Sequence, residues 1–78
     1  MNMERRKKPR LGDVVKLILG PLQTLQVHIV LEGAVGLIVD TCGIHIWVRL
    51  FAVPWEGHSG LEYVRRDSVE ILSYANPQ

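Results

Sequence analysis

Apolar and polar residues alternate along several stretches of the chain. Every second residue is apolar in two segments, Leu25, Val27, Ile29 and Leu31 first, and then Ile44, Ile46, Val48 and Leu50. In the second segment the intervening positions are His45, Trp47 and Arg49. A period of two places alternate side chains on opposite faces of an extended strand. The pattern therefore predicts a small antiparallel β-structure in which each strand buries one face.

Six short strands and one 3₁₀ turn account for the pattern, and no window has helical periodicity. The expected strands are Val14–Leu19, Thr24–Leu31, Ala34–Asp40, Gly43–Val53, Leu61–Val64 and Val69–Leu72. Residues 66–68 are expected to form a single 3₁₀ turn before the last strand. Gly43 suits the positive φ of a tight hairpin, and Gly36 within a strand indicates a bend or a close backbone approach.

The buried face follows from the same alternation. We expect the core to consist of Val14 or Val15, Leu17 or Ile18, Val35, Ile44, Ile46, Val48, Leu50, Val69 and Ile71. Five or six strands in so short a chain either close into a barrel or leave exposed edges. The predicted fold class is therefore all-β, an SH3-like antiparallel barrel of five to six strands. An OB-fold is the alternative, but it requires a helix where this chain has the Pro- and Gly-containing segment 54–60.

Two groups of motifs resemble known barrels. Residues 12–17 (GDVVKL) and 20–22 (GPL) resemble the opening of KOW-type barrels, which occur in ribosomal proteins and transcription-elongation factors. Residues 33–35, 39–40, 43–44, 48–51 and 67–69 resemble the barrel of photosystem I reaction-centre subunit IV. The variable chain of ferredoxin–thioredoxin reductase is similar. The first resemblance implies association with nucleic acid or the ribosome, and the second implies a docking subunit of a photosynthetic electron-transfer complex.

Charge divides the chain into a tail and a body. Residues 1–10 carry a net charge of +4, whereas residues 11–78 carry −3, although the whole chain has only +1. We therefore expect a flexible basic arm at 1–10, the barrel at 11–74 and a frayed C-terminus at 75–78. The single cysteine, Cys42, excludes an internal disulfide and favours the cytoplasm or an organelle interior. No apolar run approaches the ~18 residues of a membrane span, and no secretory signal is expected.

Catalytic and metal-binding patterns are weak in this chain. Cys42 and His45 have a C-x-x-H spacing, and His28 is a further candidate on a predicted strand, but tetrahedral zinc usually takes its four ligands as two close pairs, and a second pair would need His58 from a loop. Surface histidines beside a turn cysteine are the preferred interpretation, so we predict no metal and no cofactor. No nucleophile elbow or phosphate-binding glycine loop is present. The chain is predicted not to be an enzyme.

Aromatic side chains and the basic arm are the candidate binding features. Trp47 lies on the face opposite the predicted core row, Trp55 in a loop and Tyr63 on a strand, so with Phe51 they predict an outer surface that binds a protein partner. The alternative is a second small core beneath residues 24–31. The arm residues Arg5, Arg6, Lys7, Lys8 and Arg10 could bind an acidic partner or nucleic acid through phosphates, which would make binding strongly salt-dependent. The sequence thus predicts an accessory interaction module, with nucleic-acid association as the alternative.

Overall fold

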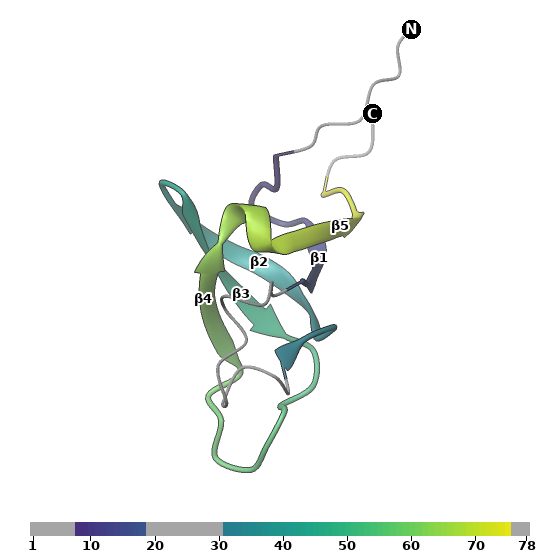
Figure 1. Ribbon diagram of the computed structural model, residues 1–78, viewed down its shortest axis with the longest axis vertical. Coiled ribbons are helices and arrows are strands. Elements are labelled where there is room, and N and C mark those ends of the chain that lie inside the picture. Colours follow the sequence, from purple (N-terminus) through teal and green to yellow (C-terminus); the bar gives the residue numbers. More distant parts are fainter. Residues whose placement is uncertain (1–7, 19–30, 76–78) are drawn as a thin grey trace, which may run out of the picture.

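The computed structural model describes residues 8–18 and 31–75, which form one antiparallel sheet of five strands (Figure 1). The strands are β1 (Val14–Leu17), β2 (Val35–Cys42), β3 (His45–Leu50), β4 (Leu61–Arg65) and β5 (Val69–Ser73), in the order β4-β3-β2-β1-β5. A 3₁₀ turn at Arg66–Ser68 connects β4 to β5. These findings confirm the all-β class, the antiparallel pairing and the 3₁₀ turn before the last strand. The strand expected at Thr24–Leu31 lies, apart from Leu31, outside the described residues.

The β2–β3 hairpin shows why one core prediction is wrong. The turn consists of Gly43, with φ of 63°, and Ile44, so the positive φ expected at Gly43 is confirmed. Ile44 was expected in the core but is 62% exposed, because it lies in the turn, before the ladder begins at His45. The two-residue alternation applies only where neighbouring strands cover the residue, and the hairpin tip extends past them. The backbone carbonyl of Ile44 accepts a hydrogen bond from the Arg66 N–H at 2.7 Å.

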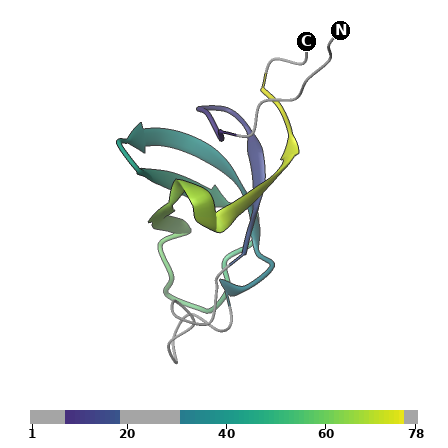
Figure 2. The ribbon, with the colours of Figure 1, turned by 45° about the horizontal axis from the view of Figure 1, so that its top comes forward.

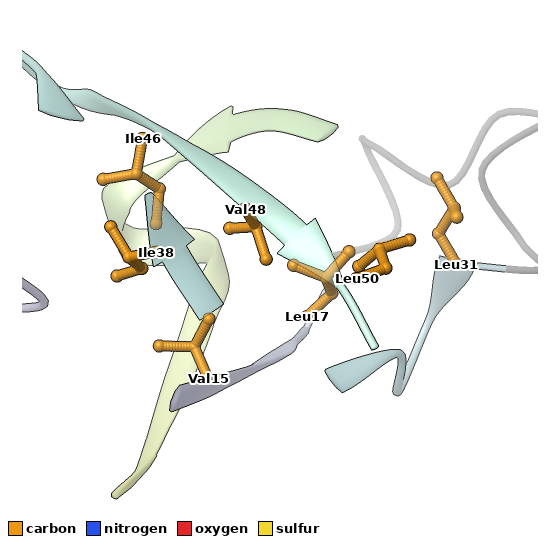
Figure 3. Packing of buried hydrophobic residues seen from close by; sticks show 7 residues of the cluster. All are labelled: Val15, Leu17, Leu31, Ile38, Ile46, Val48 and Leu50. Carbon is orange, nitrogen blue, oxygen red and sulfur yellow. The ribbon is translucent and has the colours of Figure 1, made fainter. Parts of the chain in front are cut away.

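The core gathers inward-facing side chains from the three central strands, β1, β2 and β3, together with Leu31, which precedes β2 (Figure 3). Its buried members are Val15, Leu17, Leu31, Ile38, Ile46, Val48 and Leu50. Five of these were predicted, and the half-buried Val69 and Ile71 pack against the cluster as expected. Val35 was expected in the core but is half-buried, and the predicted core omitted two buried residues, Leu31 and Ile38. In Figure 2, β1 and β5 run side by side, consistent with their antiparallel pairing.

A bulge in β2 decides which side chains face outward. Ile38 pairs with Val48 and Asp40 pairs with Trp47, so Val39 is the extra residue. Without this bulge Asp40 would share the inner face of Ile38; with it, Asp40 lies on the outer face opposite Trp47. Gly36 precedes the bulge, and a Cβ there would lie 2.5 Å from the Arg49 carbonyl oxygen. The close backbone approach predicted at this glycine is confirmed.

A buried carboxylate connects the two ends of the sheet domain. Asp13 is 0% exposed and its side chain accepts from the Arg10 N–H at 2.8 Å and the Ala75 N–H at 2.9 Å. Pro9 is also buried, and its carbonyl accepts from Arg66 Nη1 at 2.5 Å. The last two residues of the predicted arm, Pro9 and Arg10, therefore contact the sheet domain. Residues 1–7 and 76–78 lie outside the described part of the chain.

Candidate functional site

The outer face of β3 and β4 carries exposed aromatic side chains. Because Ile46 and Val48 face the core, the alternating residues His45, Trp47 and Arg49 face outward. Trp47 pairs across the ladder with Tyr63 of β4. Trp47 is 38% exposed and Tyr63 is 45% exposed, which is considerable for rings on a sheet. The structure thus brings these two predicted partner-binding residues together on one face.

His45 completes this cluster, which we call the aromatic face (His45, Trp47 and Tyr63). The His45 and Tyr63 rings are stacked, with centroids 4.6 Å apart and planes 12° from parallel. The Trp47 and Tyr63 rings lie 4.8 Å apart at 44°. Offset and tilted pairs at such distances stabilise one another and hold the rings in fixed orientations. Sequence reasoning missed His45 as a site residue, although its position two residues before Trp47 places it on the same face.

The Tyr63 hydroxyl lies beside Cys42 at the hairpin. Desolvation raises the pKa of the Tyr63 hydroxyl above its ordinary 10.0, and its hydrogen bond and electrostatic interaction with Cys42 raise the pKa further. The phenol therefore stays neutral and able to donate a hydrogen bond throughout the physiological pH range. Cys42 is exposed and is a free thiol. The aromatic face accordingly has a polar margin at the hairpin end.

Charged side chains flank the aromatic face. Arg65, on β4, forms a two-point contact with Asp67, with Nε to Oδ1 at 3.1 Å and Nη2 to Oδ2 at 3.0 Å. This contact raises the pKa of Arg65 and lowers the pKa of Asp67, chiefly through the hydrogen bonds. At the other end of β3, Arg49 is exposed and pairs in register with Leu61 and Leu37. Within the described part of the chain, no hydrogen bond or ion pair to the Arg49 side chain is found.

The other two predicted aromatic residues lie apart from this cluster. The Trp55 ring meets the His58 ring edge-on at 4.6 Å, in the loop of residues 51–60 that extends from the sheet in Figure 1. Phe51 follows directly after β3 and is 63% exposed. Among the described residues, neither ring contacts the aromatic face. Packing of these rings against residues 24–30 falls outside the described residues.

His58 fixes the start of β4. Its side chain is only 6% exposed, and its Nδ1 accepts the Gly60 N–H at 2.7 Å. Because Nδ1 is an acceptor, the ring proton is on Nε2, which donates to Glu62 Oε2 at 2.5 Å. The contact joins the loop to the strand four residues later. We read His58 as a structural residue that orders the first residues of the β4 edge.

Two residues of the basic arm are described. Lys8 and Arg10 are exposed and flank Pro9, which Arg66 holds through its carbonyl. Arg66 also donates to the Gly43 carbonyl, at 2.9 Å from Nη2 and 3.2 Å from Nε. The contacts bring the end of the arm to the hairpin. Arg5, Arg6 and Lys7 lie outside the described residues.

The candidate metal ligands do not assemble where they can be described. Across residues 8–18 and 31–75, no group of three His, Cys, Asp or Glu side chains could hold a metal ion. Cys42 and His45 pair across the hairpin, but His45 stacks on Tyr63, and His58 is bound to Glu62. His28 lies outside the described residues. In the same described ranges, no helix is long and apolar enough to cross a membrane.

Comparisons of the chain with protein families, with curated proteins and with solved structures find no match.

Proposed function

We propose that this protein is a non-catalytic interaction module with an SH3-like barrel, whose aromatic face binds a protein partner. The single observation that carries the proposal is the aromatic face: the Tyr63 ring packs on both His45 and Trp47, and the Trp47 and Tyr63 rings are exposed on the outer face of β3 and β4. Exposed Trp and Tyr carry a solvation cost, and such rings dominate the energetics of protein interfaces. A pre-packed cluster loses little side-chain freedom on binding.

The strand order supports the SH3-like assignment. An SH3-like barrel places its last strand beside its first and continues through the second, third and fourth strands. The observed order β5-β1-β2-β3-β4 and the 3₁₀ turn between β4 and β5 agree with that arrangement. A barrel of this kind buries one face of every strand, so binding falls to the outer surface and to the loops.

The test is a comparison of partner affinity among surface variants of the full chain. The immobilised chain is used to capture and identify a partner, whose affinity is then measured by titration calorimetry. Trp47→Ala and Tyr63→Ala should each weaken binding by about 2 kcal/mol, or roughly 30-fold, with little loss of stability. Leu72→Ala, which removes a side chain that is 49% exposed on β5, is the control and should leave affinity unchanged. Binding that survives both ring substitutions would refute the proposal.

Nucleic-acid association is the second candidate, and one observation favours it. The anchoring of Pro9 by Arg66 places Lys8 and Arg10 next to a sheet that also exposes Arg49 and stacked rings. Aromatic platforms with flanking cations bind single-stranded nucleic acid through base stacking and phosphate contacts. Titration with an oligothymidylate at several salt concentrations distinguishes the two candidates, because phosphate contacts make the affinity fall steeply with salt.

A further inference from the structure

Among residues 8–18 and 31–75, the backbone of β4 is paired along one side and open along the other. β4 is the last strand in the sheet order, so only β3 pairs with it in the described part of the chain. Two hydrogen bonds show which residues of β4 are bonded to β3. The Leu50 N–H donates to the Gly60 carbonyl, and the Arg66 N–H donates to the Ile44 carbonyl. In an antiparallel ladder, residues bonded to the neighbour alternate with residues whose N–H and C=O point away. Glu62 therefore faces β3.

Leu61, Tyr63 and Arg65 consequently direct their backbone groups to the open edge. The Leu61 N–H already donates to the Ser59 hydroxyl at 3.2 Å. The N–H groups of Tyr63 and Arg65 have no such partner among the described residues. The open edge thus offers two donors, with carbonyl acceptors on either side of them.

The direction of the β4 side chains distinguishes this edge from an edge that offers backbone hydrogen bonds alone. The residues that face the edge are also those whose side chains lie on the outer side of the sheet, because hydrogen-bond direction and side-chain face alternate together along a strand. A strand added here would place its bonded residues beside Tyr63, within reach of the aromatic face. The opposite edge of the sheet is β5. There the Ile18 N–H donates to the Ser68 carbonyl, so by the same alternation the backbone groups of Val69 and Ile71 point away from β1. Their side chains pack on the core, so that edge lacks a comparable outer surface.

We propose that an extended segment of a partner protein pairs antiparallel with β4, with one apolar residue between two carboxylates at alternate positions. This deepens the proposed function, on which it rests, by specifying how the aromatic face is used. The apolar side chain packs on Tyr63. One carboxylate meets Arg65, and the other meets Arg49, which is in register with Leu61 and has no ionic partner among the described residues.

The charges at this edge match that occupant. Asp67 already shares Arg65, but the pair is exposed, with 51% and 69% of the side chains accessible, and such a pair exchanges readily. Glu62, the acidic residue on β4, is held toward the loop by His58. Backbone pairing supplies affinity, while the alternating side chains supply specificity, which is the general division in β-strand addition.

Amide hydrogen exchange of the ¹⁵N-labelled full chain tests the geometry. In the free protein, the amides of Glu62 and Val64 should exchange slowly, and those of Tyr63 and Arg65 should exchange rapidly. The probe is the peptide Thr-Glu-Thr-Val-Thr-Glu-Thr with acetylated and amidated ends. Saturation with it should slow exchange at Tyr63 and Arg65 at least about tenfold. Tyr63→Ala should weaken peptide binding about fivefold to tenfold.

Matched peptides separate backbone pairing from other contacts. N-methylation of the central Val removes an N–H that faces β4 and should weaken binding at least about tenfold, whereas N-methylation of either adjacent Thr should change it less than about twofold. Replacing both Glu residues by Lys should also weaken binding. Equal effects of the N-methyl groups, no saturable binding by about 1 mM peptide, or tighter binding of oligothymidylate at the same residues would overturn the proposal.

The outcomes also distinguish this proposal from the proposed function. A captured partner whose affinity depends on Trp47 and Tyr63, but which leaves the Tyr63 and Arg65 amides in rapid exchange, would refute strand addition and retain the interaction module. A partner whose affinity is unaffected by both ring substitutions would refute both.

Discussion

Replacing Asp13 by Ala tests how much the buried, hydrogen-bonded Asp13 carboxylate stabilises the folded protein. The carboxylate is 0% exposed and accepts two backbone N–H groups, from Arg10 at 2.8 Å and from Ala75 at 2.9 Å. Hydrogen bonds to a charged group contribute about 1.5–3 kcal/mol each, and removing the acceptor leaves both donors unpaired. Both hydrogen bonds are part-buried, so water can bind the two N–H groups once the carboxylate is removed. The expected loss of stability per hydrogen bond is therefore near the lower end of this range.

We therefore expect Asp13→Ala to lower the free energy of unfolding by about 3 kcal/mol. A domain of this size has a total stability of about 4–12 kcal/mol, so the change is large. Urea denaturation followed by far-UV circular dichroism at pH 7 measures this change in the free energy of unfolding. An unchanged m-value would show that the substitution alters stability and not the surface exposed on unfolding. Asp13→Asn keeps one acceptor oxygen and should fall between the wild type and the Ala variant.

The control is Asp67→Ala, which removes an exposed aspartate and should leave the urea midpoint close to that of the wild type. Hydrogen exchange should localise the effect of Asp13→Ala to the amides of Arg10 and Ala75. A loss under about 1 kcal/mol in the Asp13→Ala variant, with those two amides unchanged, would refute the role assigned to this carboxylate.

Three further substitutions test the core, the close backbone contact between β2 and β3 at Gly36, and the surface ion pair of Arg65 and Asp67. Ile46→Ala should lower the free energy of unfolding by about 2–4 kcal/mol, measured in urea, because its side chain is fully buried. Gly36→Ala should cost about 3 kcal/mol in the same assay, because the added Cβ meets a backbone carbonyl at 2.5 Å. Arg65→Ala should return the lowered carboxyl pKa of Asp67 toward its ordinary 3.8 in a ¹³C NMR titration. Because that pKa is depressed in the folded protein, the pair stabilises the fold above the ordinary pKa and loses its effect as pH falls through the depressed value.

The strands were predictable because β3 has a regular period of two. Ile46, Val48 and Leu50 face the core and Trp47 faces outward, as the alternation predicts. The 3₁₀ turn was predictable from the short polar segment before the last apolar residues. The prediction failed at Ile44, where the ladder ends and alternation carries no information about burial.

Features that depend on contacts between distant segments were not predictable. The bulge at Val39 is a property of the pairing between β2 and β3, and no local residue preference indicates it. Burial of Asp13 depends on Ala75, which is 62 residues away, so a local reading places Asp13 only at the start of a strand. The ring cluster is of the same kind: Trp47 was expected on the outer face, but its contact with Tyr63 depends on the β3–β4 register.

The β3–β4 register determines both the outer face and the open edge. A slip of one residue would exchange the faces, bringing Glu62 and Val64 outward and turning Tyr63 toward the core. Several contacts oppose that slip: Val64 packs against the core, Arg66 bonds the hairpin at Gly43, and His58 holds Glu62 at the opposite end. Contacts at both ends of β4 thus keep the rings and the unpaired backbone groups on the same residues. The proposed strand addition depends on this arrangement. The residues of β4 that offer backbone hydrogen bonds to a partner strand are the same residues whose side chains lie on the outer face, so one partner segment can contact both.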